Sequence, residues 1–183
     1  ADRSGYTRDE ADRLATPLSP LSPRGLYWAA TRASLRLGGK ISDGIALGHR
    51  TGFDSGSTLD YVYRDTPSGK SAIGRAADKA YLDSIGWKGI RRRKTHVEEL
   101  VRLAIGRLGE EGRPVRIVDI AAGHGRYVLE ALEAPGVARP DSILLRDYSD
   151  INVEAGGRLI AEKGLAGIAR FERGDAFDRG SLA

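Results

Sequence analysis

The residues best suited to chemistry lie in a glycine-rich turn, Ala121-Ala-Gly-His-Gly125. The turn follows residues 115–120, an apolar run rich in valine and isoleucine, which is typical of a buried parallel strand. Gly123 and Gly125 can adopt positive φ and let a ligand approach the backbone closely. The pattern therefore predicts a strand, a tight loop and a helix from about residue 126 to 134, with a ligand at the loop.

Acidic residues follow this strand and two more predicted strands. Asp119 ends the first, Asp147 follows the strand predicted over 142–145, and Asp175 follows the strand predicted over 168–173. We expect Asp150 to cap a helix between the second and third strands, with Ile151 turned inward. Strand and helix in alternation indicate a parallel sheet, whose ligands bind at the carboxyl ends of the strands.

The charges at this sheet edge favour a cationic ligand. A dinucleotide-binding turn needs a third glycine, where this chain has Val128. A pyrophosphate near Asp119 would be repelled, by roughly 4 kcal/mol at 4 Å and an effective dielectric constant of 20. S-adenosylmethionine instead carries a sulfonium and an ammonium group. We expect Asp119 to face that cationic end, and the backbone from Ala121 to Gly125 to pass beneath the cofactor.

The other two loops can then hold the nucleoside. The carboxylate of Asp147 can accept hydrogen bonds from both ribose hydroxyls. We expect Tyr148 to lie against the adenine face and Asp175 to accept from the exocyclic amine, with Ala176 beside it. Two other interpretations stay open: Asp147 could cap the next helix, and Asp175 could belong to a turn.

These motifs resemble those of class I S-adenosylmethionine-dependent methyltransferases. The resemblance rests on Val-Asp-Ile-Ala-Ala-Gly-His-Gly-Arg, on Leu-Leu-Arg-Asp147 and on Arg-Gly-Asp175-Ala176, in this order. Residues 48–63 and Gly-Trp87-Lys-Gly-Ile-Arg further resemble a group of bacterial methyltransferases with a helical region before this domain. The resemblance implies a Rossmann-like sheet of seven strands, of which three are present. We therefore expect a fragment, truncated after the third strand, which could be inactive alone.

The predicted organisation has three parts: a flexible arm over 1–23, a helical N-terminal region over 24–109, and the N-terminal half of a Rossmann-like methyltransferase domain over 110–183. Prolines at 17, 20 and 23 favour an extended arm. Helical patterns occupy residues 24–37 and, after a cap at Ser42, 43–47. Another extends to Arg64 after a cap at Asp54 or Ser55, a fourth covers 71–85 and ends before Gly86, and a last one, just after the basic run over 91–94, reaches residue 108. The fold class is α/β.

Composition and charge leave other functions open. The chain has no cysteine and no apolar window long enough to span a membrane, so we expect a cytoplasmic protein without a metal site. The basic run Arg91-Arg92-Arg93-Lys94 could bind an acidic partner, but a solvated helix start is the favoured interpretation, because no nucleic-acid motif accompanies the run. The alternatives to a methyltransferase are an NAD(P)-dependent oxidoreductase and a non-catalytic basic module.

His124 could border the cofactor or act on a substrate proton. The methyl acceptor, any general base and the oligomeric state are not predicted.

Overall fold

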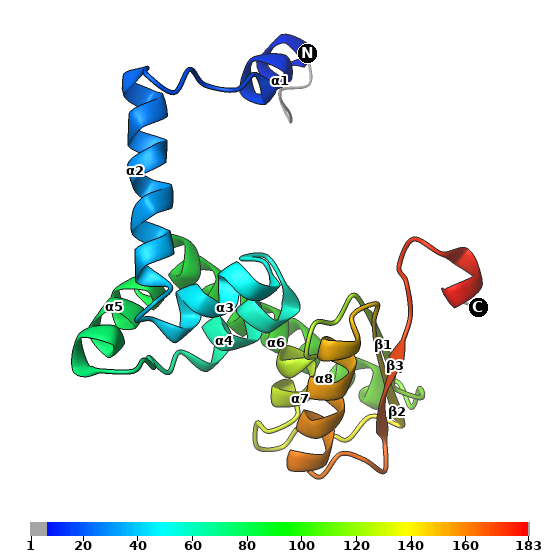
Figure 1. Ribbon diagram of the computed structural model, residues 1–183. Helices are drawn as coiled ribbons and strands as arrows, with labels where there is room; N and C mark the ends of the chain where they lie inside the picture. The colour runs from blue at the N-terminus through cyan, green and yellow to red at the C-terminus, as the bar shows by residue number, and fades with distance from the viewer. Residues whose placement is uncertain (1–6, 183) are drawn as a thin grey trace. The chain divides into compact units, whose positions relative to one another are not determined.

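The N-terminal helices form a unit of their own. The computed structural model describes residues 7–182, and the chain divides into two compact units after Gly38. The first contains α1 (Arg8–Ala15) and α2 (Pro23–Gly38), shown in Figure 1. Thr7 and Glu10 form a capping box that starts α1, so the arm predicted over 1–23 contains a helix, and the Thr-x-x-Glu signal for it was missed. Residues 1–6 of that arm lie outside the described residues.

Four helices open the second unit: α3 (Asp43–Thr51), α4 (Gly56–Arg64), α5 (Ala72–Leu82) and α6 (Ile85–Glu110). Serine side chains cap the first three, at Ser42, Ser55 and Ser71, by accepting a backbone N–H three residues ahead. Such caps satisfy one of the unpaired N–H groups at each helix start. The predicted helices and two of their caps are therefore confirmed.

The prediction for α6 was wrong at its start. The basic run over 91–94 was expected just ahead of this helix, but α6 begins at Ile85 and carries the run within it. Packing explains the difference, because Trp87 and Ile90 lie against a buried cluster that includes Leu82. Packing against a buried cluster outweighs the low helix propensity of single glycines.

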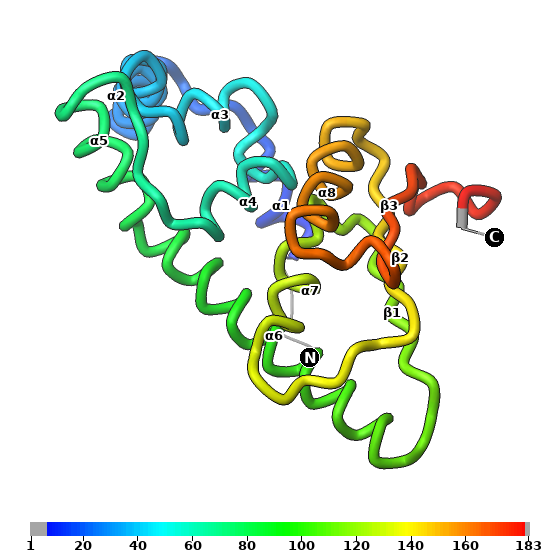
Figure 2. The backbone as a smooth tube through the Cα atoms, turned by 90° about the horizontal axis from the view of Figure 1, so that it is seen from below, coloured from blue at the N-terminus to red at the C-terminus, as the bar shows by residue number. Residues whose placement is uncertain are grey.

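A three-stranded parallel sheet follows, in the order β1-β2-β3. Its strands are β1 (Arg116–Ile120), β2 (Ser142–Asp147) and β3 (Ala169–Arg173), and a short 3-10 helix, η1 (Arg179–Leu182), comes last. The connecting helices α7 (Arg126–Ala131) and α8 (Asp150–Glu162) lie on one side of the strands (Figures 1 and 2). The α/β fold with a helical region before the sheet is confirmed.

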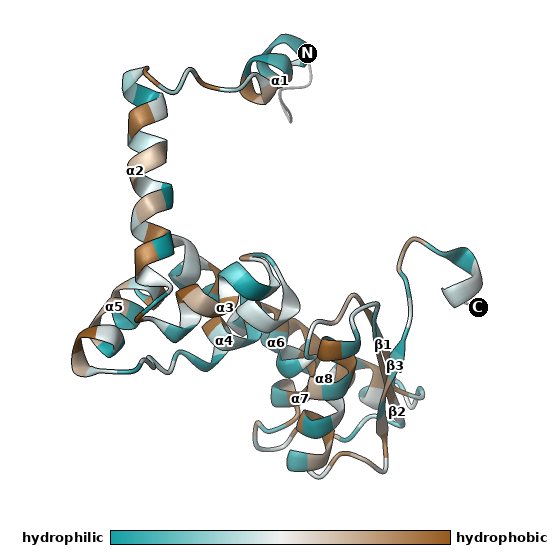
Figure 3. Cartoon of the chain, in the orientation of Figure 1, coloured by the Kyte–Doolittle hydropathy of each residue, from teal (hydrophilic) through white to brown (hydrophobic). Residues whose placement is uncertain are grey.

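The core lies between this sheet face and the two helices. Ile143 and Leu145 of β2 are fully buried against Leu129 of α7. The opposite sheet face is open, since Val118 of β1 is 60% exposed. Figure 3 shows hydrophobic and hydrophilic residues on the same helices, as expected for helices with one buried side.

Two expectations about α8 were wrong. Ser149, not Asp150, is the N-cap residue, and its side chain makes no capping hydrogen bond. Ile151 is largely exposed, whereas Asn152 of the same turn is buried. The helix turns this polar side chain inward because Asp147 lies there to accept its hydrogen bond.

Gly125 is the residue of the turn for which we expect the steepest stability cost on substitution. Its φ is 70°, and a Cβ there would lie 2.3 Å from Cδ1 of the fully buried Leu145. Gly125→Ala should therefore lower the free energy of unfolding by about 2–5 kcal/mol, from backbone strain and overpacking together. Gly136→Ala is the matched control in urea unfolding, because φ there is 79° and nothing lies within 4 Å. It should cost only about 1–2 kcal/mol, and equal costs would contradict the packing argument.

Candidate functional site

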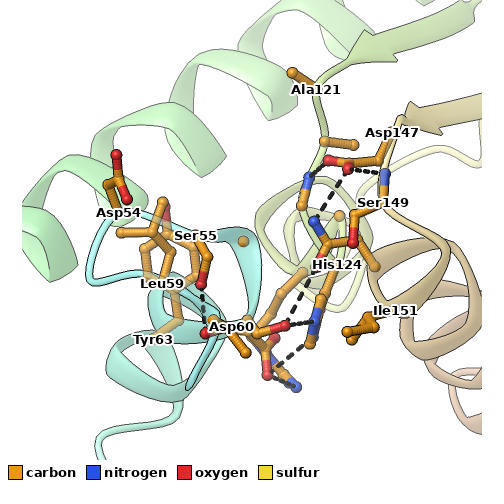
Figure 4. Close-up of a pocket in the computed structure, with 18 of the residues that line it drawn as sticks. Asp54, Ser55, Leu59, Asp60, Tyr63, Ala121, His124, Asp147, Ser149 and Ile151 are labelled. Atoms are coloured by element: carbon orange, nitrogen blue, oxygen red, sulfur yellow. Dashed lines mark hydrogen bonds and ion pairs between the residues drawn. The ribbon is translucent and has the colours of Figure 1, made fainter. Parts of the chain in front are cut away.

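A cavity of about 950 Å³ lies at the carboxyl ends of β1 and β2. The helical region lines one side, and the loops after the two strands line the other (Figure 4). Lining residues include Leu47, Leu59 and Tyr63 from the helices, Ala121 to Tyr127 from the turn, and Asp147 to Ser149 with Ile151 and Asn152 from the second loop. This size is typical of a cavity for a small molecule or cofactor.

The glycine turn folds back under the cavity through left-handed backbone conformations. The φ angles are 60° at Ala121 and at Gly123, and 70° at Gly125. Because Ala121 carries a Cβ, its conformation costs about 1–2 kcal/mol that glycine would not incur. The start of α4 rests directly on this turn, since a Cβ on Gly56 would lie 2.6 Å from Cα of Gly123. The helical region therefore forms part of the site.

Asp147 is the buried acid of the cavity, with 5% of its surface exposed. One carboxylate oxygen accepts from the backbone N–H of Gly123 at 2.9 Å. The other accepts from the Ser149 N–H at 2.9 Å and from the Asn152 side-chain amide at 3.0 Å. A carboxylate offers about four acceptor positions, so about one is left for a ligand. The exposed ring of Tyr148 lines the same cavity.

Asp119 lies behind the turn and outside the cavity lining. Its carboxylate accepts a hydrogen bond from the Tyr127 hydroxyl at 2.5 Å, and Tyr127 does line the cavity. Burial raises the pKa of Asp119, the Tyr127 hydrogen bond lowers it, and the negative charge of Asp147 raises it further. The net pKa is above the ordinary value, so a nearby cation would stabilise the charged form.

Asp175 and Ala176 are predicted site residues that, like Asp119, do not line the cavity. The exposed Asp175 carboxylate accepts the Phe177 N–H at 2.9 Å, and its own N–H donates to the Ser181 hydroxyl at 2.8 Å. These contacts belong to the turn after β3. Their role at an adenine stays a prediction.

A polar cluster in the wall of the cavity was missed from the sequence. His124 Nδ1 lies 3.3 Å from Oδ2 of Asp60, and His124 Nε2 lies 3.2 Å from Oγ of Ser57. Arg126 Nε donates to Oδ1 of Asp60 at 2.6 Å. The signal available was the three-residue spacing of Ser57 and Asp60, which places both on one helix face. Nothing in the sequence paired that face with the glycine turn.

The electrostatics of this cluster keep Asp60 ionised. Burial by itself would raise the pKa of Asp60, but the hydrogen bonds and charges of His124 and Arg126 outweigh it and lower the pKa to about 2. Arg64 adds an ion pair at 3.2 Å. At neutral pH, Asp60 is therefore a hydrogen-bond acceptor only.

The basic run of α6 is partly neutralised within the chain. Arg91 pairs with Asp65 at 3.2 Å and donates to the Leu82 carbonyl at 3.0 Å. Lys94 pairs with Glu98 and with Glu130. This pairing weakens the interpretation of the run as a surface for an acidic partner.

Residues 7–182 contain neither a metal-binding cluster nor a membrane-spanning helix. Among these residues, no group of three or more histidine or acidic side chains is arranged to hold a metal ion. Within the same range, no helix combines the length and the apolar character needed to cross a membrane.

Comparisons with known proteins identify the family of the chain. "Uncharacterized protein YnbC" of Escherichia coli (strain K12) is 50% identical over all 183 residues, and the chain spans 31% of the length of that relative. The co-crystal structure of WbdD with the kinase inhibitor LY294002 is also similar. The match covers 62% of this chain and 23% of the WbdD chain, with 18% sequence identity and a TM-score of 0.33. A family model described as "Putative methyltransferase" matches residues 1–183. Because that match spans the whole chain, the chain belongs to this methyltransferase family.

Proposed function

We propose that the chain holds the methyl-donor site of an S-adenosylmethionine-dependent methyltransferase. The observation that carries the proposal is the left-handed turn from Ala121 to Gly125, which lines one cavity together with Asp147 and Tyr148. Glycine at two of the turn positions leaves the backbone uncovered toward the cavity. A carboxylate and an aromatic ring beside this backbone can bind a nucleoside that carries a positively charged group.

The charges support a cationic ligand over a dinucleotide. Asp119 and Asp147 lie close enough for the charge of one to raise the pKa of the other. A bound cation relieves this repulsion, whereas a pyrophosphate increases it. Val128, where a dinucleotide site needs glycine, is buried against the sheet.

Each residue then has a role in binding. We assign the open acceptor position of Asp147 to a ribose hydroxyl, and the ring of Tyr148 to the adenine face. The carboxylate of Asp119 acts from behind the turn, on the side of the sulfonium and ammonium charges. Asp175 and Ala176 are proposed for the adenine edge, which requires the loop after β3 to close onto the cavity.

Catalysis is chiefly a matter of placement. The cofactor supplies an activated methyl group, and the protein must hold an acceptor in line with it. Such alignment reaches effective molarities on the order of 10⁵ to 10⁸ M. Leu47, Leu59 and Tyr63 of the helical region form the wall opposite the glycine turn, so we place the acceptor there. The activity of a longer protein containing this chain is part of the same proposal.

Calorimetry with S-adenosylhomocysteine tests the donor site. We expect micromolar binding to the wild-type chain and a roughly 10- to 100-fold loss in Asp147→Asn, because one charge-assisted hydrogen bond contributes about 1.5–3 kcal/mol. Glu154→Gln removes the same charge from an exposed position of α8, where Glu154 pairs with Arg158. That control should bind within twofold of the wild type.

The competing functions predict different results. Tighter binding of NADH than of S-adenosylhomocysteine would indicate an oxidoreductase. Affinity for RNA with a steep salt dependence, and none for S-adenosylhomocysteine, would indicate a basic binding module. Either result contradicts the proposed function.

A further inference from the structure

A chain of side-chain contacts joins the helical region to the acid of the cavity. It runs from Asp60 to His124, then to Ser57, to Asn152 and to Asp147. The four steps measure 3.3, 3.2, 3.3 and 3.0 Å. Ser57, Asp60, Asn152 and Asp147 are buried, and 15% of the His124 side chain is exposed. Figure 4 shows His124 between Asp60 and the loop that carries Asp147.

The direction of each hydrogen bond follows from the ends of this chain. The Asn152 amide nitrogen donates to Asp147, so its carbonyl oxygen is the atom that faces Ser57. A carbonyl oxygen only accepts, and the Ser57 hydroxyl has one hydrogen. That hydrogen therefore points at Asn152, and the Ser57 oxygen must accept from the other side.

The histidine between them must then donate twice. Nε2 of His124 has to donate to Ser57, while Nδ1 has to donate to the ionised Asp60. Only the imidazolium form carries hydrogens on both ring nitrogens. In the neutral form one contact is lost, and Ser57–Asn152 is the one expected to break, because the bond to the Asp60 carboxylate is charge-assisted and stronger.

We propose that His124 is an imidazolium in the assembled site and that, through Ser57 and Asn152, it positions the carboxylate of Asp147 for the ligand. The inference rests on the proposed function for its ligand, but the hydrogen-bond chain exists without one. His124 and Ser57 are thus positioning residues, which act through Asp147. Cofactor affinity becomes dependent on pH, because the chain of hydrogen bonds is complete only while both ring nitrogens of His124 carry a hydrogen.

The other charged groups near His124 either favour its imidazolium form or have their own charge compensated by a partner. Asp60 faces the ring from α4, with Arg64 paired to it on its far side. Arg126 is the cation nearest in sequence, and its charge is compensated by Asp60 and by Glu130 at 2.8 Å. On the side of α8, the His124 ring contacts the Ser57 hydroxyl, which in turn contacts the neutral side chain of Asn152.

A double-mutant cycle tests the hydrogen-bond chain without any ligand. Ser57→Ala and Asn152→Ala, singly and together, are compared by urea unfolding at pH 5.5 and pH 8.0. We expect their coupling to change the unfolding equilibrium constant roughly three- to tenfold at pH 5.5, the contribution of one neutral hydrogen bond, and not at pH 8.0. Coupling that is equal at both pH values, or absent at pH 5.5, would overturn the proposal.

Titration calorimetry with S-adenosylhomocysteine tests the link to the cofactor. Ser57→Ala should lower affinity roughly three- to tenfold at pH 5.5 and leave it within twofold at pH 8.0. His124→Gln should abolish that difference, whereas His96→Gln, on the exposed side of α6, should keep the wild-type profile. A pH dependence that survives in His124→Gln overturns the inference. Coupling at pH 5.5 without any binding of S-adenosylhomocysteine would instead refute the proposed function and leave the hydrogen-bond chain standing.

Discussion

Asp60→Asn is expected to lower the free energy of unfolding at pH 7 by about 3–5 kcal/mol, the cost of breaking a buried ion pair from one side. Asp60 is 4% exposed and pairs with Arg126, Arg64 and His124. The asparagine keeps the shape but leaves Arg126 with Glu130 as its remaining anionic partner. Urea unfolding of the two proteins measures the difference directly.

The pH dependence gives this prediction a second signature. The pKa of Asp60 is about 2 in the folded chain, against 3.8 ordinarily. A depressed pKa contributes stability that is complete above pH 3.8 and is lost as the pH falls through the folded value. The contribution is about 2 kcal/mol, so the cost of Asp60→Asn should shrink as the pH is lowered from 4 toward 2.

Asp83→Asn is the control, because it removes the same charge from an exposed ion pair. Asp83 is exposed at the end of α5 and pairs with Lys79 at 2.6 Å. Exposed pairs of this kind are worth about 0–1 kcal/mol, so the control should unfold almost like the wild type at every pH. A pH-independent cost in Asp60→Asn would show that packing, and not the charge, makes Asp60 important.

The sheet and its ligand edge could be predicted because their signals are local. A run of β-branched residues ending in Gly123 and Gly125 specifies a strand and a tight turn within a few residues of itself. Parallel pairing then brings Asp147 to the same edge without further information. The predicted strands, the turn after the first strand and the predicted helices all depend on such local signals, and the structure confirms these elements.

The helical half of the site could not be predicted, because its contacts join residues far apart in the chain. The sequence around Ser57 and Asp60 predicts no more than a capped helix. Nothing in that segment alone shows that Gly56 touches Gly123, or that His124 lies between Ser57 and Asp60. The start of α6 was missed for the same reason, since Trp87 gains its helical environment from packing and not from its neighbours in sequence.

Asp78→Asn should destabilise the chain by about 3 kcal/mol or more, although it changes one oxygen to an amide nitrogen. Asp78 is fully buried and joins four donors from the helical region. Oδ1 accepts from the Ser42 hydroxyl at 2.5 Å and the Gly44 N–H at 2.8 Å. Oδ2 accepts from the Tyr61 hydroxyl and from the Ser68 N–H at 2.9 Å.

The reason is that neither orientation of the asparagine fits. A hydroxyl can rotate to present a lone pair, but a backbone N–H cannot, and each carboxylate oxygen of Asp78 faces one. The amide nitrogen must therefore meet the N–H of Gly44 or of Ser68, which leaves buried donors unpaired at about 1–3 kcal/mol each. Tyr61→Phe removes one donor from Asp78 and leaves its other three in place, so its cost in urea unfolding should be only about 1 kcal/mol. Equal costs for the two variants would mean that Asp78 acts through Tyr61 alone. The larger cost for Asp78→Asn would mean that this carboxylate of α5 holds the start of α3, Tyr61 of α4 and the loop at Ser68 together, and with them the helical wall that faces the glycine turn.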